Sequence, residues 1–307
     1  MRALVITNMY PSTDDPARGS FVRDQVEALR SLPGTEIELF AFASRGASAY
    51  AEAAGQLRRR YRAAAFDVIH AHFGLTLWPA LALRQAPHAV TLHGTDLVHP
   101  RSRVITRAGL RFADLVAPVS EALAQLVPDW AVRGRRAILP CGVDTDRFHP
   151  IDRLEARRAL GLEESAPYLL FPANPGRPEK RFDRAVAVAG ETRLLTLGRV
   201  EPAQVPLWVN AANAVLVPSD RESFGLSVLE ALACDVPVLA TPVGVAPEAL
   251  SGVAGAYCAP FDPAAWSAAL EPLLAQADPR VAGRPQAEKY SALAMAKRVL
   301  AAWRSLA

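Results

Sequence analysis

The fold is predicted most directly by residues 214–233, AVLVPSDRESFGLSVLEALA. The four apolar residues Ala214–Val217 indicate a strand that is buried on both faces. A polar loop follows, and from Leu226 onward apolar residues recur at helical spacing. This strand–loop–helix unit predicts a parallel α/β sheet. In such sheets, ligands bind at the loops that follow the strands.

The same alternation of apolar runs and helix-period segments continues along most of the 307 residues. It predicts βαβ units in two Rossmann-like halves, because this length suits two domains of about 150 residues better than one. We expect the first domain over residues 1–148 and the second over residues 149–290. The polar residues 144–150 are predicted to link them, and residues 291–307 to form a final helix.

Composition limits the classes of partner. The net charge is +3 and no basic run is long, which argues against nucleic acid. The densest cluster has four arginines between Arg58 and Arg62; we interpret it as a solvated helix face, with an anionic membrane or acceptor patch as the alternative. Neither a signal peptide nor a membrane-spanning run is evident. We expect a soluble cytoplasmic protein and leave peripheral association with the inner membrane face open.

Two carboxylates mark the helix predicted after residue 225. Glu222 stands just before this helix and Glu230 within it, and eight positions span roughly 12 Å. The amides of Phe224, Gly225 and Leu226 would face a phosphate at the helix start. Carboxylates repel phosphate but accept hydrogen bonds from sugar hydroxyls, so the pattern fits a nucleotide sugar. The alternative is that Glu222 caps the helix and Glu230 is solvated.

A diphosphate leaving group also needs positive charge. The loop at residues 174–181 offers Arg177, which can bind phosphate oxygens in a bidentate manner, and Lys180, a point charge. A charged surface loop is the alternative. The run Asp144-Thr145-Asp146 has the spacing of a metal site but lies in the predicted linker, so we expect metal-independent chemistry.

The first half has its own candidates at the ends of predicted strands. Gly19 and Ser20 precede a predicted helix and would give a backbone-lined approach to the second phosphate, although no G-x-G-x-x-G fingerprint is present. His93 follows a strand beside glycine and is a candidate functional residue. His70 and His72 share a strand face by parity; they could suggest a metal pair, but a structural or acceptor-side role is favoured because no third ligand is evident.

Together these motifs resemble the retaining glycosyltransferases of family 4, which have the GT-B fold and use nucleotide-activated sugars. The spaced glutamates are the most specific match. Other matches lie at residues 10–11, 19–22, 68–72, 92–96, 119–120, 139–144 and 177–180. Residues 170–180 and 205–212 are similar to the compact branch typified by teichuronic acid glycosyltransferases, which implies polysaccharide or glycoconjugate synthesis.

The resemblance implies a role for each candidate. Glu222 would contact the donor sugar and Glu230 the ribose, while Arg177 and Lys180 would hold the diphosphate. His93 would lie beside the transferred sugar, and Gly19 near the phosphates. It also implies two domains facing a central cleft, an acceptor-binding first domain, a donor-binding second domain, and a last helix that crosses back to the first.

The activity implied is retaining transfer from a UDP- or GDP-linked sugar to a hydroxyl of a glycan, lipid-linked or small-molecule acceptor, without a further cofactor. No carboxylate nucleophile is evident, which favours a front-side route. Two features depart from the family: Val245 follows Gly244 where Gly-Gly is frequent, and the second domain is short between residues 181 and 214. The alternatives are an epimerase or phosphorylase on the same fold, and a non-catalytic sugar-nucleotide-binding partner.

Overall fold

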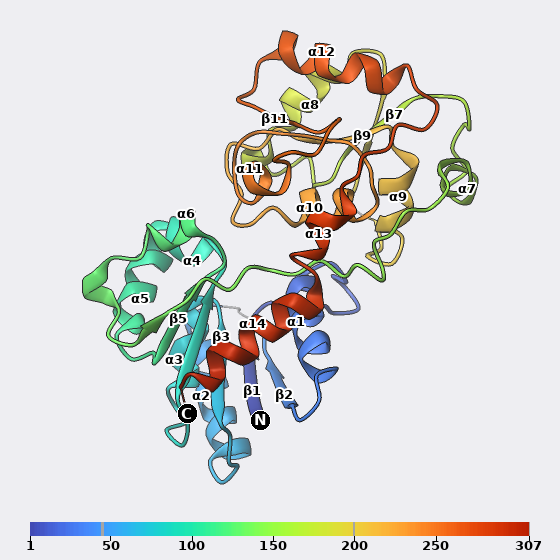
Figure 1. Ribbon diagram of the computed structural model, residues 1–307. Coiled ribbons are helices and arrows are strands. Elements are labelled where there is room, and N and C mark those ends of the chain that lie inside the picture. The colour runs from blue at the N-terminus through green and yellow to red at the C-terminus, as the bar shows by residue number, and fades with distance from the viewer. Residues whose placement is uncertain (44–45, 199, 307) are drawn as a thin grey trace. The chain divides into compact units, whose positions relative to one another are not determined.

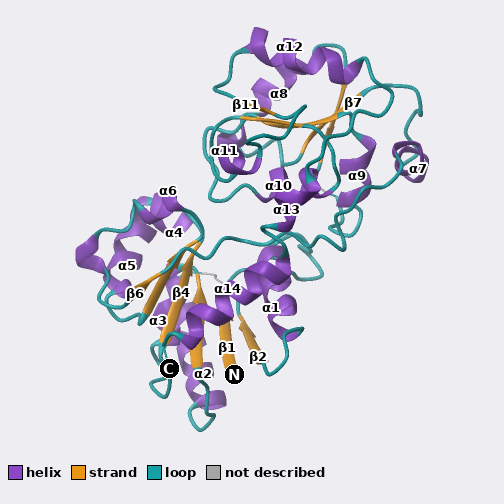
Figure 2. Cartoon of the chain, viewed as in Figure 1, coloured by secondary structure: helices purple, strands orange, loops and turns teal. Residues whose placement is uncertain are grey.

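The computed structural model describes residues 1–43, 46–198 and 200–306. The chain forms two compact units. Unit 1 comprises Met1–Gly142 with the chain from Ala292 onward, and unit 2 comprises Val143–Ser291. Each unit has its own parallel sheet and its own helices (Figures 1 and 2), which confirms the predicted α/β class.

Within its described residues, unit 1 contains a six-stranded parallel sheet in the order β2-β1-β3-β4-β5-β6. The strands are β1 (Arg2–Thr7), β2 (Glu36–Ala41), β3 (Val68–His72), β4 (His88–Leu92), β5 (Leu115–Pro118) and β6 (Arg135–Arg136). Residues 88–92 and 115–118 are largely apolar runs that predict strands, and β4 and β5 have these same bounds. The apolar residues 137–139 predict a strand, but the strand in the structure is β6, whose two residues pair with Leu115 and Val116 of β5. Beyond β6, the amides of Ala137 and Leu139 still donate to the carbonyls of Val116 and Pro118 at 3.2 and 3.0 Å.

The described helices of unit 1 range from 3 to 15 residues in length. They are α1 (Ser20–Arg30), α2 (Ala47–Tyr61), η1 (Gly74–Thr76), α3 (Leu77–Ala80), α4 (Thr95–Val98), α5 (Pro100–Leu110), α6 (Glu121–Ala124), η2 (Asp129–Ala131) and α14 (Ala292–Arg304). Ser120 caps α6, and its hydroxyl accepts from the Leu123 amide at 3.3 Å. Helix α2 starts at Ala47, with Gly46 at its N-cap.

The apolar pattern of residues 75–84 predicts one helix. In the structure this segment divides into η1 and α3, and α3 ends at Ala80. Its last turn tightens into i→i+3 bonds, from the amides of Ala82 and Leu83 to the carbonyls of Pro79 and Ala80.

The C-terminal helix α14 packs in the core of unit 1. It lies beside α1 over the same sheet (Figure 1), and Met295 and Val299 share a buried cluster with Val22 and Val26 of α1. Trp303 is fully buried near the end of α14. Burial of this apolar face explains why the end of the chain belongs to unit 1.

The described part of unit 2 contains a five-stranded parallel sheet in the order β11-β10-β9-β7-β8. The strands are β7 (Tyr168–Phe171), β8 (Arg193–Thr196), β9 (Ala214–Val217), β10 (Val238–Ala240) and β11 (Tyr257–Cys258). The helices are α7 (Arg153–Ala159), η3 (Pro178–Lys180), α8 (Phe182–Ala189), α9 (Val205–Ala211), α10 (Leu226–Ala233), α11 (Ala246–Ala249), α12 (Pro263–Leu274) and α13 (Arg284–Glu288).

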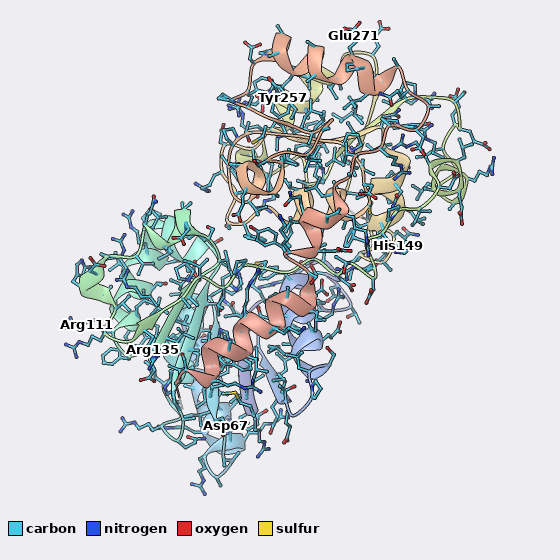
Figure 3. The ribbon with its side chains drawn as sticks, viewed as in Figure 1. Asp67, Arg111, Arg135, His149, Tyr257 and Glu271 are labelled. Atoms are coloured by element: carbon cyan, nitrogen blue, oxygen red, sulfur yellow. The ribbon has the colours of Figure 1, made fainter. Side chains whose placement is uncertain are left out.

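One side of this sheet is covered by α8 and α12. Figure 3 shows Tyr257 on the inner side of α12, where it packs edge-on against Trp266 at 6.1 Å, while Glu271 points outward from the same helix. Strand β11 was not predicted, because two residues are too few to show a period.

The residues predicted as a linker are part of unit 2. Phe148 is buried, and the Arg284 guanidinium donates to the carbonyls of Phe148 and Thr145 at 3.1 and 2.9 Å. The polar side chains of this segment suggested a linker. Its backbone carbonyls, however, bind the side chain of a residue that is distant in the sequence.

Arg153 is a buried anchor of unit 2. Its side chain is 1% exposed, donates to the carbonyls of Asn210 and Pro279 at 3.2 and 3.1 Å, and pairs with Asp278 at 3.0 Å. Burial lowers the pKa of Arg153 to about 9.

We expect Arg153→Met to lower the free energy of unfolding of unit 2 by about 3 to 5 kcal/mol, because buried carbonyls lose their donors. Urea unfolding monitored by circular dichroism measures this loss. Arg158→Met is the matched control: Arg158 forms an exposed pair with Glu164, so its loss should leave the urea midpoint unchanged. Equal midpoints for the two variants would contradict the anchoring role.

Candidate active site

Loops from three neighbouring strands meet at one edge of the sheet in unit 2. Strands β7, β9 and β10 are adjacent, so the loops at their carboxyl ends lie together. Lys180 follows β7, Glu222 follows β9 and Gly244 follows β10. The sheet order therefore brings together two residues that stand 42 positions apart: the Lys180 Nζ lies 2.7 and 2.6 Å from the two carboxylate oxygens of Glu222.

The Lys180–Glu222 pair is largely buried. The side chains are 15% and 7% exposed, and the Ser219 hydroxyl donates to Glu222 Oε1 at 2.8 Å. The carboxylate of Glu222 is therefore fixed by three hydrogen bonds. Because an ammonium group has three protons and Glu222 takes two, Lys180 keeps one donor for a further oxygen.

The start of α10 lies directly after this pair. Among the described residues, no hydrogen bond uses the amides of Phe224, Gly225 or Leu226, which are therefore open to an acceptor, as predicted for a phosphate. Glu230 lies half-buried on the same helix. A cation, a fixed carboxylate and open helix amides thus lie together at one edge of the unit 2 sheet.

The turn after β10 holds the Glu222 loop in place. Gly244 has a φ of 61°, and a Cβ there would collide with the Phe224 carbonyl. The next amide, that of Val245, donates to this same carbonyl at 2.6 Å. Val245 is buried, with its side chain beside Gly225. The residue that departs from the family pattern therefore lies at the start of α10.

Arg177 occupies a different position from Lys180. Its side chain is 58% exposed and pairs through Nε and Nη2 with Glu179, at 2.9 and 2.6 Å. Within the described residues its guanidinium forms no hydrogen bond or ion pair with Lys180 or Glu222. The structure thus joins two of the predicted donor residues and directs the third toward a neighbouring carboxylate.

His93, the candidate of unit 1, belongs to a buried chain of side chains. Its Nε2 lies 3.0 Å from His72 Nδ1. His72 Nε2 lies 3.3 Å from the side-chain amide nitrogen, Nε2, of Gln25 on α1. Because this nitrogen donates, His72 accepts at Nε2 and donates from Nδ1 to His93. The proton of His93 is then on Nδ1, where it is available to another group.

His70 is oriented by the C-terminal helix. Trp303 Nε1 can only donate, and it lies 3.0 Å from His70 Nδ1, so the proton of His70 is on Nε2 and reaches Thr91 Oγ1 at 2.8 Å. The rings of His70 and His72 stack at 4.9 Å, which confirms that they share a face. Their four ring nitrogens are engaged in hydrogen bonds, which supports the structural role and not the metal pair.

Burial makes this histidine chain neutral. Desolvation lowers the pKa of His72 to about 3 and those of His70 and His93 well below the ordinary value. A neutral imidazole can exchange a hydrogen bond with a hydroxyl but cannot balance the charge of a diphosphate. The chemistry open to His93 is therefore hydrogen bonding.

Four residues for which the sequence predicted no role of their own surround the histidine chain. One is Gln25, which contacts His72. Phe21 and Phe73 place their rings 4.8 and 4.7 Å from the His93 ring. Phe73 has a φ of 73°, a left-handed conformation that is rare for a bulky residue. The buried Asp96 accepts from the amides of His93 and Gly94 at 3.2 and 2.8 Å. Its place at a strand end, two residues after Gly94, was the available signal.

Gly19 and Ser20 immediately precede Phe21, whose ring packs against the ring of His93. Gly19 has a φ of 67° at the N-cap of α1, and a Cβ there would collide with the Met9 carbonyl. Only glycine allows the loop after β1 to fold back so closely on the helix start. Unit 1 therefore does bring its three predicted residues into one neighbourhood.

The Asp-x-Asp run forms a local turn. Asp144 Oδ1 accepts from the amides of Asp146 and Arg147 at 3.1 and 3.0 Å. Across the residues that the structure describes, no group of three histidine, cysteine or acidic side chains is placed to hold a metal ion.

Two family models match the chain. The model described as Glycosyltransferase Family 4 matches residues 5–147, and the model described as Glycosyl transferases group 1 matches residues 166–276. D-inositol 3-phosphate glycosyltransferases are among the curated relatives. The protein from Geodermatophilus obscurus is 32% identical over 71% of this chain and 61% of its own length. The one from Actinosynnema mirum is 31% identical over 71% of this chain and 66% of its own length. The chain thus spans about two thirds of these relatives or less.

Solved structures share the fold. A sucrose-phosphate synthase from Thermosynechococcus elongatus is 20% identical, with a TM-score of 0.76 over 100% of this chain and 99% of that chain. HepE from Anabaena, solved in complex with UDP-glucose, is 17% identical, with a TM-score of 0.74 over 99% of this chain and 100% of that chain. Such structures have the GT-B fold. The chain therefore belongs to the GT-B glycosyltransferases, with a family 4 domain in unit 1 and a group 1 glycosyl transferase domain in unit 2.

Proposed function

We propose that this protein transfers a sugar from a nucleotide-diphosphate sugar to a hydroxyl acceptor, with retention of anomeric configuration and without a metal. The observation that carries the proposal is the buried Lys180–Glu222 pair beside the open amides at the start of α10. These groups supply a cation and backbone donors for a diphosphate, and a carboxylate for a sugar hydroxyl.

Each group has one role. Lys180 turns its remaining donor to the diphosphate, and the amides of Phe224, Gly225 and Leu226 share the charge. Glu222, whose orientation is fixed by Lys180 and Ser219, accepts from a hydroxyl of the donor sugar. Glu230 accepts from the ribose, and Arg177 reaches the diphosphate by leaving Glu179.

The front-side route follows from these roles. As the bond from the anomeric carbon to the diphosphate oxygen breaks, that oxygen gains charge, which Lys180 and the helix amides stabilise. The same oxygen takes the proton of the incoming hydroxyl. The hydroxyl oxygen therefore attacks the anomeric carbon from the face on which the leaving group departs. His93, neutral and protonated on Nδ1, donates a hydrogen bond to a hydroxyl of the transferred sugar.

The relatives narrow the substrates. HepE was solved in complex with UDP-glucose, which supports a UDP-linked sugar ahead of a GDP-linked one. The curated relatives are named for D-inositol 3-phosphate, which favours a phosphorylated polyol or a similar hydroxyl acceptor. The compact-branch resemblance keeps cell-surface glycoconjugate synthesis as the proposed pathway class, with peripheral membrane association.

The proposal is tested by calorimetry with UDP and GDP, followed by product analysis with a panel of UDP-sugars and polyol phosphates. We expect UDP to bind without added metal, and EDTA to leave transfer unchanged. NMR of the product should show the anomeric configuration of the donor. Epimerised donor without acceptor, phosphate-dependent turnover, or binding without any turnover would each replace the transferase with one of the alternatives.

A further inference from the structure

A hollow lined by arginines lies at the amino-terminal edge of the unit 1 sheet. It has a volume of about 730 Å³, and its lining includes the arginines at positions 58, 59, 62 and 84. A second hollow of about 820 Å³ shares Arg58 and Arg84 and reaches His88, the first residue of β4. His93 lies just past the other end of β4. The arginine hollow is therefore at the opposite edge of the sheet from the candidate site.

Two segments of chain build the hollow. Arg58, Arg59 and Arg62 come from the end of α2, and Arg84 follows α3. The Gln85 side chain ties the segments together by donating to the carbonyl of Tyr61 at 2.9 Å. The macrodipole of α2 favours basic residues at its own C-terminus. It does not explain why the fold places Arg84 against them.

These four guanidinium groups have no carboxylate partner. Over residues 1–43, 46–198 and 200–306, none of them forms an ion pair, whereas Arg177, Arg181 and Arg184 all do. Among the same residues, no carboxylate lines the first hollow. Asp114 lines the second, and its Oδ2 accepts from the His88 amide at 2.8 Å. Like charges gathered without partners repel one another, so they fit an external anion.

Exposed aromatic and aliphatic side chains border the hollow. Trp78 and Phe112 line the second hollow, are 40% and 57% exposed, and touch edge-on at 6.2 Å. The Trp78 indole donates to the carbonyl of Ile105 on α5. Ile105 is itself 47% exposed. Arg111, the neighbour of Phe112 in the sequence, points outward in Figure 3. Cationic and apolar groups thus form one continuous surface, which we call the docking face: Arg58, Arg59, Arg62, Arg84, Trp78, Ile105 and Phe112.

We propose that the docking face binds the surface of an anionic phospholipid bilayer. Guanidinium groups pair with headgroup phosphates, and an amphipathic indole such as that of Trp78 suits the membrane–water interface. Charge complementarity favours this partner, because the arginines without carboxylate partners can pair with anionic headgroups. The apolar side chains can at the same time enter the membrane–water interface. No helix of the described residues is long and apolar enough to cross a membrane.

Vesicle sedimentation tests this face. The full chain is mixed with vesicles of phosphatidylcholine containing about one third phosphatidylglycerol, and with pure phosphatidylcholine. We expect the wild type to bind only the anionic vesicles, and less tightly as salt rises. Arg59→Gln/Arg84→Gln removes one charge from each wall and should weaken binding by roughly tenfold or more. Trp78→Ser/Phe112→Ser should weaken it with both charges in place.

The matched control is Lys297→Gln/Arg304→Gln, which removes two exposed charges from α14 of the same unit. An equal loss of vesicle binding in Arg59→Gln/Arg84→Gln and in the control would overturn the docking face, because net charge alone would then explain binding. So would equal binding to neutral vesicles, or calorimetric binding of inorganic phosphate without vesicle binding. UDP affinity should be unchanged in the face variants, so failure of this proposal is distinct from failure of the proposed transfer.

Discussion

Lys180→Ala is expected to lower donor turnover by about 100- to 1000-fold, the loss typical of removing one stabiliser of a developing negative charge. The Lys180 Nζ lies 2.6 Å from Glu222 and is the cation adjoining the start of α10. Its removal both weakens the hold on the diphosphate and frees the Glu222 carboxylate, which then keeps the hydrogen bond from Ser219 as its one partner among the described residues. Steady-state kinetics with the donor found by calorimetry measures the loss.

Arg181→Gln is the control for this variant. Arg181 is the next residue and carries the same charge, but it pairs with Asp183 at 2.7 Å and Asp220 at 3.1 Å. Its removal should change turnover by no more than about threefold, since exposed pairs contribute little. Glu222→Gln separates the two roles of the pair: UDP should still bind, because Lys180 remains, while donor turnover falls. Unchanged turnover in both Lys180→Ala and Glu222→Gln would remove the site assignment.

Unit 1 is expected to lose stability steeply as pH falls from about 7 to about 5. His70, His72 and His93 are buried and neutral, with pKa values below that of an unfolded histidine, about 6.5. The unfolded chain therefore binds more protons below about pH 6.5. Each histidine then costs about 1.4 kcal/mol of unfolding free energy per pH unit, until its own folded pKa is reached. For His72 that limit is about 3.

Two other buried groups modify this slope. Burial also lowers the pKa of His88, which adds to the acid sensitivity. It raises the pKa of Asp96, which acts in the opposite direction. Three histidines are therefore expected to dominate, and the free energy of unfolding should fall by several kcal/mol across this range.

Urea unfolding at a series of pH values measures the slope. His72→Phe keeps a buried aromatic ring but cannot bind a proton, so its slope should be shallower even if the variant is less stable at about pH 7. His149→Gln, which changes an exposed histidine, should keep the wild-type slope. A wild-type stability that stays constant over this range would show that the histidine chain is protonated in the folded state.

Local patterns predicted elements whose identity is set by nearby residues. The run Ala214–Val217 is a strand in the structure, and Leu226 begins the helix that follows. Element ends were less accurate where tertiary packing intervenes. The helix predicted at residues 75–84 is divided, and residues 144–150 are held in unit 2 by a distant arginine.

The sequence by itself determined the parallel α/β class and the nature of the groups at the strand ends, because alternation and strand-end chemistry are local properties. It could not pair Lys180 with Glu222, since they are 42 positions apart and only the adjacency of β7 and β9 joins them. Nor could it place Trp303 on His70 or Arg84 beside Arg58, because each contact depends on which buried faces pack together. Tertiary structure alone decided these contacts, since side-chain distance is set by strand order and packing.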